Sequence, residues 1–307
     1  MNNARYNKFQ KYLLNWYRKH NRDYLPWRFT KARPVSPYEV FVSEIMLQQT
    51  QVARVLEQYP QFLKAFPAIH HLARAPLEKI LRVWQGMGYN RRARYLKEAA
   101  KKIVELHGGI IPSDPALLRA LPGVGPYTAG AIVCFAYNGP TIFLDTNIRK
   151  TLINYFFYPQ KCYNKFCHGK IYVALSKIKK IDKINKNKIT DNTNKIDDED
   201  LLHIAKKTLY TKNPRRWHYA LMDYGATMLA KEKWLLERAK SYHKQSRFEG
   251  SPRYWRSQIV KYLLQYEQAS GEELQAHVSC DIHPLVTSLV QDGLVEVASP
   301  GLYRISP

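Results

Sequence analysis

The sequence lacks long apolar runs, cysteine clusters and a normal share of acidic residues. The longest apolar stretch, Ala131–Tyr137, is far too short to cross a bilayer, and the opening residues contain no apolar run of signal-peptide length. We therefore expect a cytoplasmic protein that does not bind membranes. The four cysteines are scattered, and the spacing of Cys162, Cys167 and His168 matches no standard zinc site, so we expect no bound metal.

The shortage of acidic residues leaves a large positive charge. Lys and Arg number 48 against 25 Asp and Glu, which gives a net charge of +23 and a pI near 9.8. Such an excess favours a polyanionic partner, because each neutralised phosphate releases condensed counterions. A basic ribosomal or membrane-surface protein has a similar composition, but the chain lacks the basic amphipathic helix or lipidation site of a membrane binder.

Helical periodicity dominates the first 248 residues, so the fold class is mainly α. Apolar residues at helical spacing predict a helix over 5–20, and Ser36-Pro37-Tyr38-Glu39 has the form of a capping box that begins a helix running to about Tyr59. The Lys-, Asn- and Ile-rich residues 158–198 read as a surface insertion that is partly disordered. Helical pattern resumes at Asp200 and continues to about Lys231.

The tail, residues 249–307, differs from the rest. Its pattern predicts helices over 254–266, 271–278 and 284–292, followed by strands over 294–298 and 302–306 around a Ser-Pro-Gly turn. Three helices followed by a hairpin is the order of a winged helix. The third helix contains no Lys or Arg, however, and none occurs between Lys261 and Arg304. We therefore expect this small winged-helix-like domain to pack or bind a partner, and the basic stretch 231–261 to contact DNA.

The most specific local pattern is Leu121-Pro-Gly-Val-Gly-Pro-Tyr-Thr-Ala129, between a helical segment and a strongly apolar one. Two glycines around one aliphatic residue permit a tight turn with positive φ and leave backbone amides unobstructed. Amides at a helix N-terminus bind one phosphate without reading a base. An ordinary glycine turn is the alternative interpretation of a bare Gly-x-Gly.

With LDTNIRK at 144–150, this hairpin resembles the helix-hairpin-helix (HhH-GPD) DNA glycosylase superfamily. The segments LPWR at 25–28, VSEIMLQQTQV at 42–52 and GMGYNRRAR at 86–94 resemble its adenine DNA glycosylase branch. The resemblance implies a two-lobed domain over residues 1–248, with a six-helix lobe over about 29–143 and a second lobe from 1–28 plus 144–230. It also implies a monomer that acts on mismatched or damaged double-stranded DNA, associated with a bacterial-type nucleoid.

Glu44 is the candidate general acid. Its helical neighbours are Val40, Phe41, Leu47 and Gln48, and no Lys or Arg lies within helical reach. In an apolar pocket such a carboxyl group is expected to have a raised pKa and to hold a proton near neutral pH. A surface glutamate is the alternative, and the resemblance favours protonation of a departing purine.

Asp145 is the candidate anion. As an isolated residue before a helix it is most simply an N-cap. The resemblance places it where the superfamily aspartate stabilises the oxocarbenium-like sugar, and both roles are compatible.

The resemblance assigns the remaining site residues. It implies insertion into the base stack for Gln49, Met87 and Tyr89, although Met87 could equally be core. Tyr127 and Asn147 match catalytic-site positions, and Arg28 and Asp223 match pocket positions. Because relatives of the endonuclease III type have a lysine where this chain has Tyr127, the resemblance implies a monofunctional enzyme without a Schiff base. The DNA-contacting set is completed by Thr50, Leu121, Gly123, Val124, Gly125 and Thr128.

The chain departs from the family pattern in two places. Met222-Asp223-Tyr224-Gly225 is followed by no cysteine before Cys280, so the usual iron–sulfur cluster lacks its ligands and we expect no cofactor. The winged-helix-like tail stands where the family has a domain that reads 8-oxoguanine, which leaves the opposite base open. The favoured function is adenine removal opposite 8-oxoguanine or guanine. Thymine or uracil removal opposite guanine and non-catalytic DNA binding are the alternatives.

Overall fold

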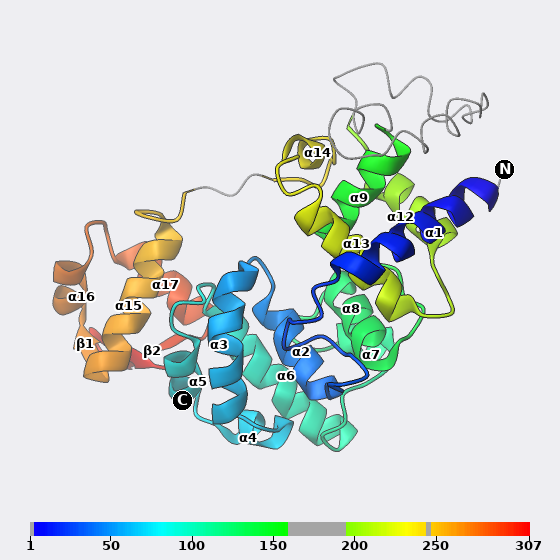
Figure 1. The fold of residues 1–307 in the computed structure, drawn as a ribbon. Coiled ribbons are helices and arrows are strands. Elements are labelled where there is room, and N and C mark those ends of the chain that lie inside the picture. Colours follow the sequence, from blue (N-terminus) through cyan, green and yellow to red (C-terminus); the bar gives the residue numbers. More distant parts are fainter. Residues whose placement is uncertain (1–2, 159–194, 244–246) are drawn as a thin grey trace. The chain divides into compact units, whose positions relative to one another are not determined.

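A computed structural model describes residues 3–158, 195–243 and 247–307 (Figure 1). The chain divides into two compact units, which are described separately. Unit 1 comprises Met1–Arg22 and Asn138–Lys244, and unit 2 comprises Asp23–Tyr137 and Gln245–Pro307. Each unit is therefore assembled from two separate stretches of the sequence.

Unit 1 is a helical assembly around an aromatic core. Its helices are α1 (Asn3–His20), α9 (Thr146–Phe156), α12 (Asp198–Thr208), α13 (Pro214–Thr227) and the short α14 (Trp234–Glu237). Phe9 of α1 contacts the rings of Phe156 and Trp217, with centroid distances of 5.1 and 5.5 Å. Because these aromatic rings join α1 to α9 and α13, the N-terminal helix is an integral part of the unit.

Unit 2 begins with seven helices. They are α2 (Pro37–Met46), α3 (Val52–Ala65), α4 (Ile69–Arg74), α5 (Leu77–Trp84), α6 (Arg91–His107), α7 (Pro115–Arg119) and α8 (Pro126–Tyr137). Helices α2 and α8 pack against each other, and continuous stretches of both, Val40–Met46 and Thr128–Phe135, are buried. Such uniformly apolar helices belong in the centre of a domain.

The C-terminal part of unit 2 is a small α+β domain, drawn orange to red in Figure 1. It contains α15 (Pro252–Tyr266), β1 (Gln268–Ser270), α16 (Gly271–His277), α17 (His283–Gln291), β2 (Val295–Ser299) and β3 (Leu302–Ile305). The three strands form an antiparallel sheet in the order β1-β3-β2. One continuous cluster of buried apolar side chains joins this domain to the seven helices.

The structure confirms the mainly helical fold and the capping box, in which the Ser36 hydroxyl accepts from the Glu39 amide and the Glu39 carboxylate accepts from the Ser36 amide. The helix predicted to reach Tyr59 is wrong, because α2 ends at Met46 and α3 begins at Val52. Helical pattern resumes at Asp198 rather than Asp200, and the segment predicted to continue to about Lys231 is two helices, α12 and α13. The tail contains β1 in addition to the predicted hairpin.

Most of the predicted insertion at 158–198, including Cys162, Cys167 and His168, lies outside the described residues. In the three described segments, the structure contains no helix with the length and apolar character needed to span a membrane.

Candidate active site

Glu44 lies on α2 in unit 2, and most residues of this helix are buried. The capping box and Pro37 fix where α2 begins, which sets the helical phase of every later residue. The Glu44 side chain is 5% exposed, and its helical neighbours Val40 and Phe41 are 1% and 0% exposed. A carboxyl group that the sequence could have placed at the surface is therefore buried among apolar side chains.

The end of α2 is tied to the glycine hairpin. The side-chain nitrogen Nε2 of Gln48 donates to the Gly123 carbonyl and to the Thr128 hydroxyl, both at 3.1 Å. These bonds hold the turn after α2 against the turn that joins α7 to α8. The helix with the candidate acid and the candidate phosphate hairpin thus form one connected structure.

The hairpin presents its backbone rather than its side chains. Gly123 has a φ of +73°, and a Cβ there would lie 2.9 Å from the Tyr95 Cβ, so glycine is required both for conformation and for space. Gly125 is exposed, has no positive φ, and an added Cβ would meet nothing within 4 Å. The first turn of α8 offers amides that have no partner within the helix. Three predicted contact side chains of the hairpin are nearly buried: Leu121, Val124 and Thr128 are 4%, 5% and 3% exposed.

Two further loops of unit 2 carry residues that the sequence assigned to insertion in the base stack. Gln49 and Tyr89 both adopt positive φ, +53° and +49°. This conformation is strained for residues with side chains and is typical of functional loops. The Gln49 side chain is exposed and Tyr89 is half-buried, whereas Met87 is 4% exposed and belongs to the apolar core. Met87 is therefore a core residue in this conformation, which was the alternative interpretation of the sequence.

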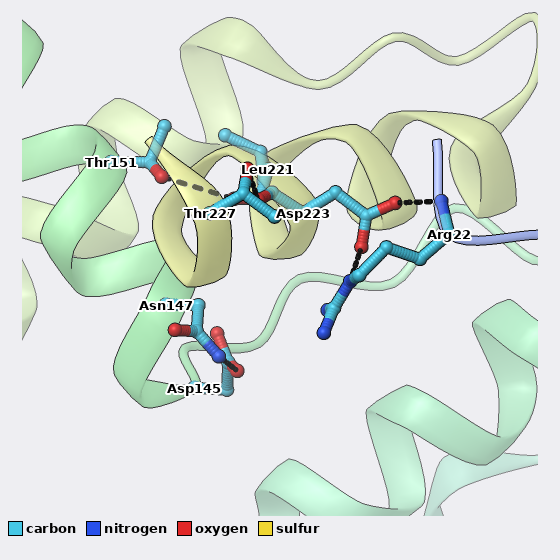
Figure 2. A network of polar contacts seen from close by, with 7 residues as sticks. All are labelled: Arg22, Asp145, Asn147, Thr151, Leu221, Asp223 and Thr227. Carbon is cyan, nitrogen blue, oxygen red and sulfur yellow. Dashed lines mark hydrogen bonds and ion pairs between the residues drawn. The ribbon is translucent and has the colours of Figure 1, made fainter. Parts of the chain in front are cut away.

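Asp145 lies at the N-terminus of α9 in unit 1, where it caps the helix. Its Oδ1 accepts from the Ile148 amide at 2.5 Å, and its Oδ2 accepts from the Asn147 side-chain amide at 3.3 Å. Figure 2 shows the Asp145 and Asn147 side chains directed toward each other. The predicted N-cap role is confirmed, and Asn147 is placed as a neighbour that orients the carboxylate.

Opposing influences act on the Asp145 carboxyl group. Burial raises its pKa above the usual value, and this is the largest influence. Hydrogen bonds from Ile148 and Asn147 and the charge of Arg149 act in the opposite direction, because they stabilise the anion. Arg149 is itself held by Asp198 at 2.7 Å and by the Leu144 carbonyl at 2.8 Å. The site thus combines burial with fixed donors to a carboxylate.

Helix α13 supports the start of α9 at very short range. A Cβ on Gly225 would lie 2.3 Å from the Asn147 carbonyl oxygen, so only glycine permits this approach. The Thr151 hydroxyl donates to the Leu221 carbonyl at 3.0 Å and ties the two helices together one turn later (Figure 2). The position of Asp145 therefore depends on a glycine of a helix distant in sequence.

Asp223, predicted as a pocket residue, is fully buried and accepts from Arg22. Its two carboxylate oxygens accept from the Arg22 backbone amide at 2.9 Å and from Arg22 Nε at 2.6 Å. In Figure 2 the Asp223 carboxylate points toward Arg22. Asp223 thereby fixes the residues after α1 against α13, which is a supporting role within unit 1.

The remaining predicted residues lie in unit 2. Arg28 is 2% exposed, and its amide donates to the Leu25 carbonyl at 3.0 Å. Tyr127 is half-buried in the first turn of α8. The Thr50 hydroxyl accepts from Arg92 at 2.8 Å. Unit 2 therefore contains Arg28, Glu44, Tyr127 and the hairpin, and unit 1 contains Asp145, Asn147 and Asp223.

The expectation of no iron–sulfur cluster rests on the sequence after the Met222–Gly225 motif, where relatives would supply cysteine ligands. Residues 226–244 contain no cysteine, and this segment folds in part as α14, whose Leu235 and Leu236 are buried. Within the described segments, no group of three or more His, Cys, Asp or Glu side chains is arranged to hold a metal ion.

Sequence reasoning missed four residues that organise the candidate site: Arg22, Gln48, Arg92 and Gly225. Arg22, Arg92 and Gly225 act on partners far away in the sequence, so helical spacing and charge pattern could not reveal them, although Arg92 and Gly225 lie in motifs that carry the family resemblance. Gln48 lies inside the VSEIMLQQTQV segment, beside Gln49, and that position was its only sequence signal.

Comparisons with known proteins find similar sequences and folds over part of the chain. Residues 42–167 match the family described as HhH-GPD superfamily base excision DNA repair protein. The adenine DNA glycosylase of Buchnera aphidicola subsp. Baizongia pistaciae is 40% identical over 178 residues, which are 58% of this chain and 49% of that protein. The adenine DNA glycosylase of Mycobacterium tuberculosis (strain ATCC 25618 / H37Rv) is 44% identical over 140 residues, 46% of this chain and 45% of that protein. The chain thus spans about half the length of the curated relatives it matches.

A solved structure of a thermostable thymine-DNA glycosylase is also similar. It aligns with a TM-score of 0.56 and 25% sequence identity over 78% of this chain and 94% of that chain. A non-covalent endonuclease III–DNA complex aligns with a TM-score of 0.51 at 15% identity, over 83% of this chain and 94% of that chain, and supports the fold alone. Residues 42–167 of this chain are thus similar to the HhH-GPD superfamily of base excision DNA repair proteins, and adenine DNA glycosylases are among the similar proteins.

Proposed function

We propose that this protein is a DNA glycosylase that hydrolyses the N-glycosidic bond of adenine mispaired with 8-oxoguanine or guanine. The observation that carries the proposal is the family match over residues 42–167, which includes Glu44, the hairpin and Asp145. The named relatives with 40–44% identity are adenine DNA glycosylases, which favours adenine as the base removed. The excess of positive charge, +23, suits a DNA substrate.

The proposed reaction uses two carboxyl groups, those of Glu44 and Asp145. Glu44 in its protonated form donates a proton to the purine as the bond from the sugar to the base breaks, and the base leaves as neutral adenine. The Asp145 carboxylate stabilises the positive charge that develops on the sugar. Water then adds to the sugar carbon and loses a proton, which leaves an abasic site.

The other residues bind DNA or orient groups in this proposal. The backbone of the hairpin at 121–128 binds one phosphate, and the loops with Gln49 and Tyr89 occupy the space left when the adenine leaves the stack. Asn147 holds the Asp145 carboxylate by the hydrogen bond described above.

Tyr127 predicts the type of product. A tyrosine hydroxyl does not form a Schiff base with the sugar, so we expect an abasic site with the strand intact. Borohydride treatment during the reaction should trap no protein–DNA adduct, and an adduct in good yield would contradict a monofunctional mechanism.

The test is a panel of duplexes with adenine, thymine or uracil opposite 8-oxoguanine or guanine, scored for strand breakage with and without alkali. We expect breakage only after alkali and only in the adenine duplexes. No product from any duplex would leave the protein as a non-catalytic DNA-binding protein and refute the proposal.

Glu44→Gln tests the general acid. The variant keeps the size of the side chain but has no proton to donate, so we expect the single-turnover excision rate to fall roughly a hundred- to ten-thousand-fold with duplex binding retained. Glu57→Gln is the matched control, because Glu57 is 64% exposed on α3. A rate for Glu44→Gln close to that of the control would exclude Glu44 as the acid.

The thymine-DNA glycosylase similarity favours a second candidate, removal of thymine or uracil opposite guanine. The same duplex panel separates the two. Product from the thymine or uracil duplexes, with Glu44→Gln fully active on them, would support the second candidate, because a pyrimidine depends less on a purine-protonating glutamate.

A further inference from the structure

We propose that the C-terminal α+β domain positions the DNA-contacting loop at 86–90, with Arg253 of α15 acting on Tyr89. Arg253 is thus inferred to be a positioning residue for the proposed glycosylase, and the inference rests on that proposed function only where DNA is concerned. The ordering of the loop by Arg253 is a property of the protein alone and can be tested without any substrate.

Two guanidinium groups lie close to the Tyr89 ring. The Arg253 guanidinium carbon lies 5.4 Å from the centroid of the Tyr89 ring, and that of Arg92 lies 5.5 Å from it. Arg253 Nη1 also donates a hydrogen bond to the Tyr89 hydroxyl. Because Tyr89 has a φ of +49°, its backbone is in an unfavourable conformation that surrounding contacts must maintain. The two arginines supply contacts of this kind.

Arg92 couples this loop to the turn after α2. Its guanidinium donates to the carbonyls of Met87 and Gly88, both at 3.0 Å, and to the Met46 carbonyl at 2.9 Å. Further bonds reach the carbonyls of Ile45 and Gln48. Burial lowers the pKa of Arg92 to about 10, so it remains a cation at neutral pH. The two strained loops, with Gln49 and Tyr89, therefore share one buried cation.

Helix α15, which carries Arg253, is connected to α6 through Asp292 at the end of α17. Arg256, on the same helix, forms an ion pair with Asp292 at the end of α17, and Arg91 of α6 pairs with the same carboxylate at 3.3 Å. Arg94 of α6 donates to the Asp292 carbonyl. Gly293 has a φ of +59°, which favours glycine, and a Cβ there would lie 2.5 Å from the Arg94 guanidinium carbon, so the Arg94 side chain would have to shift. Asp292, at the end of α17, is thus bound both by α15 and by α6.

The same contacts explain the unusual charge of the domain. Residues 262–303 contain six acidic residues and no Lys or Arg, which is unsuited to reading a DNA groove with α17. One of those acids, Asp292, is already paired with arginines of α6 and α15. The chemistry of this domain therefore fits a role within the chain, in which α17 fixes α15 and α15 positions Tyr89.

The first test measures hydrogen exchange in the free full-length protein. Arg253→Met removes the donor and the charge but keeps much of the side-chain length, and we expect amide exchange in residues 86–92 to become at least threefold faster while exchange in α8 stays unchanged. Arg304→Met is the matched control, because Arg304 is an arginine of the same domain that forms an ion pair with Glu296. Exchange in 86–92 equal in the two variants would overturn the proposal.

The second test is a double-mutant cycle on DNA binding. We expect Arg253→Met and Tyr89→Phe each to weaken binding to a mismatched duplex severalfold and to change binding to a matched duplex little. The double variant should lose no more affinity for the mismatched duplex than either single variant, because the two substitutions break the same contact. Arg253→Lys, which retains a cation and a donor, should restore part of the affinity. Additive effects, or equal losses on both duplexes, would overturn the proposal. If the protein excises no base, the exchange result still decides whether Arg253 orders the loop.

Discussion

The two candidate carboxyl groups are held in opposite ways. Glu44 lies in the last turn of α2, where Val40–Met46 are all buried, and its position follows from the packing of α2 against α8. Asp145 lies at the first turn of a helix, where hydrogen bonds from Ile148 and Asn147 hold it and Gly225 permits close approach of α13. Burial of the surrounding helix thus places Glu44, and a helix terminus with hydrogen-bond donors places Asp145. Variants near the two residues should therefore fail for different reasons.

After Glu44→Gln, Asp145→Asn gives the largest expected effect, because it separates the role of the side chain as a helix cap from its charge. Asparagine is as good an N-cap as aspartate, so the stability of α9 should change little. Loss of the anion should slow excision roughly a hundred- to a thousand-fold, as removal of one charge-stabilising group typically does. Single-turnover kinetics and urea unfolding measure the two effects. Asp114→Asn, at the N-cap of α7, is the matched control, and an equally active Asp145→Asn protein would reduce Asp145 to a structural cap.

His218 makes the Asp145 region sensitive to pH. Its ring stacks on Phe143 at 4.3 Å, two residues before Asp145, and its Nδ1 bonds the Pro214 carbonyl at 2.9 Å. Burial lowers the pKa of His218 to about 4, whereas the unfolded chain has the usual value of 6.5. As the pH falls from 6.5 to 4, the unfolded state binds the proton first, so folding stability decreases through that window by up to about 3 kcal/mol.

Urea unfolding between pH 7.5 and pH 4.5 measures this loss. His218→Phe retains an aromatic ring against Phe143 and cannot titrate, so its stability should depend less on pH than that of the wild type. His203→Gln, at an exposed position of α12, is the control. Identical pH profiles for wild type and His218→Phe would exclude a buried neutral histidine.

Gly225→Ala tests whether the close approach of α13 to the start of α9 is needed to position Asp145. Alanine in the middle of a helix usually stabilises it by about 0.5–1 kcal/mol relative to glycine. Here the new Cβ would overlap the Asn147 carbonyl, so we expect a loss of about 2 kcal/mol in unfolding free energy and a slower excision rate. The sign of the change in unfolding free energy decides the test, because a stabilised variant would mean that α9 and α13 are not in close contact.

Gln48→Ala gives the smallest expected effect and tests the connection between the turn after α2 and the glycine hairpin. It removes both hydrogen bonds from α2 to the hairpin, and we expect a loss of about 1 kcal/mol in stability with weaker duplex binding. Gln61→Ala, which loses a bond within α3 at the surface, is the control. If both variants bind DNA equally well, the link between α2 and the hairpin has no role in binding.

The sequence predicted features that depend on local chemistry. The capping box at Ser36, the N-cap role of Asp145 and the hairpin turn at Gly123 each depend on residues within three positions of one another. The helix break at 47–51 was missed because its residues carry no proline or glycine, and Arg92 holds the turn by donating to carbonyls at its ends. The bond between Arg253 and Tyr89 joins residues 164 positions apart, a distance over which no sequence periodicity operates.

The apolar core that α15, α17 and the small sheet share with the seven helices of unit 2 has a consequence for how such proteins diverge. A domain attached through a flexible linker can be exchanged without altering the surface it leaves behind. Removing this one would expose hydrocarbon on the helices beneath it and leave Arg91 and Arg94 without Asp292. A lineage that acquired or lost this domain would therefore have to remodel its partner helices at the same time.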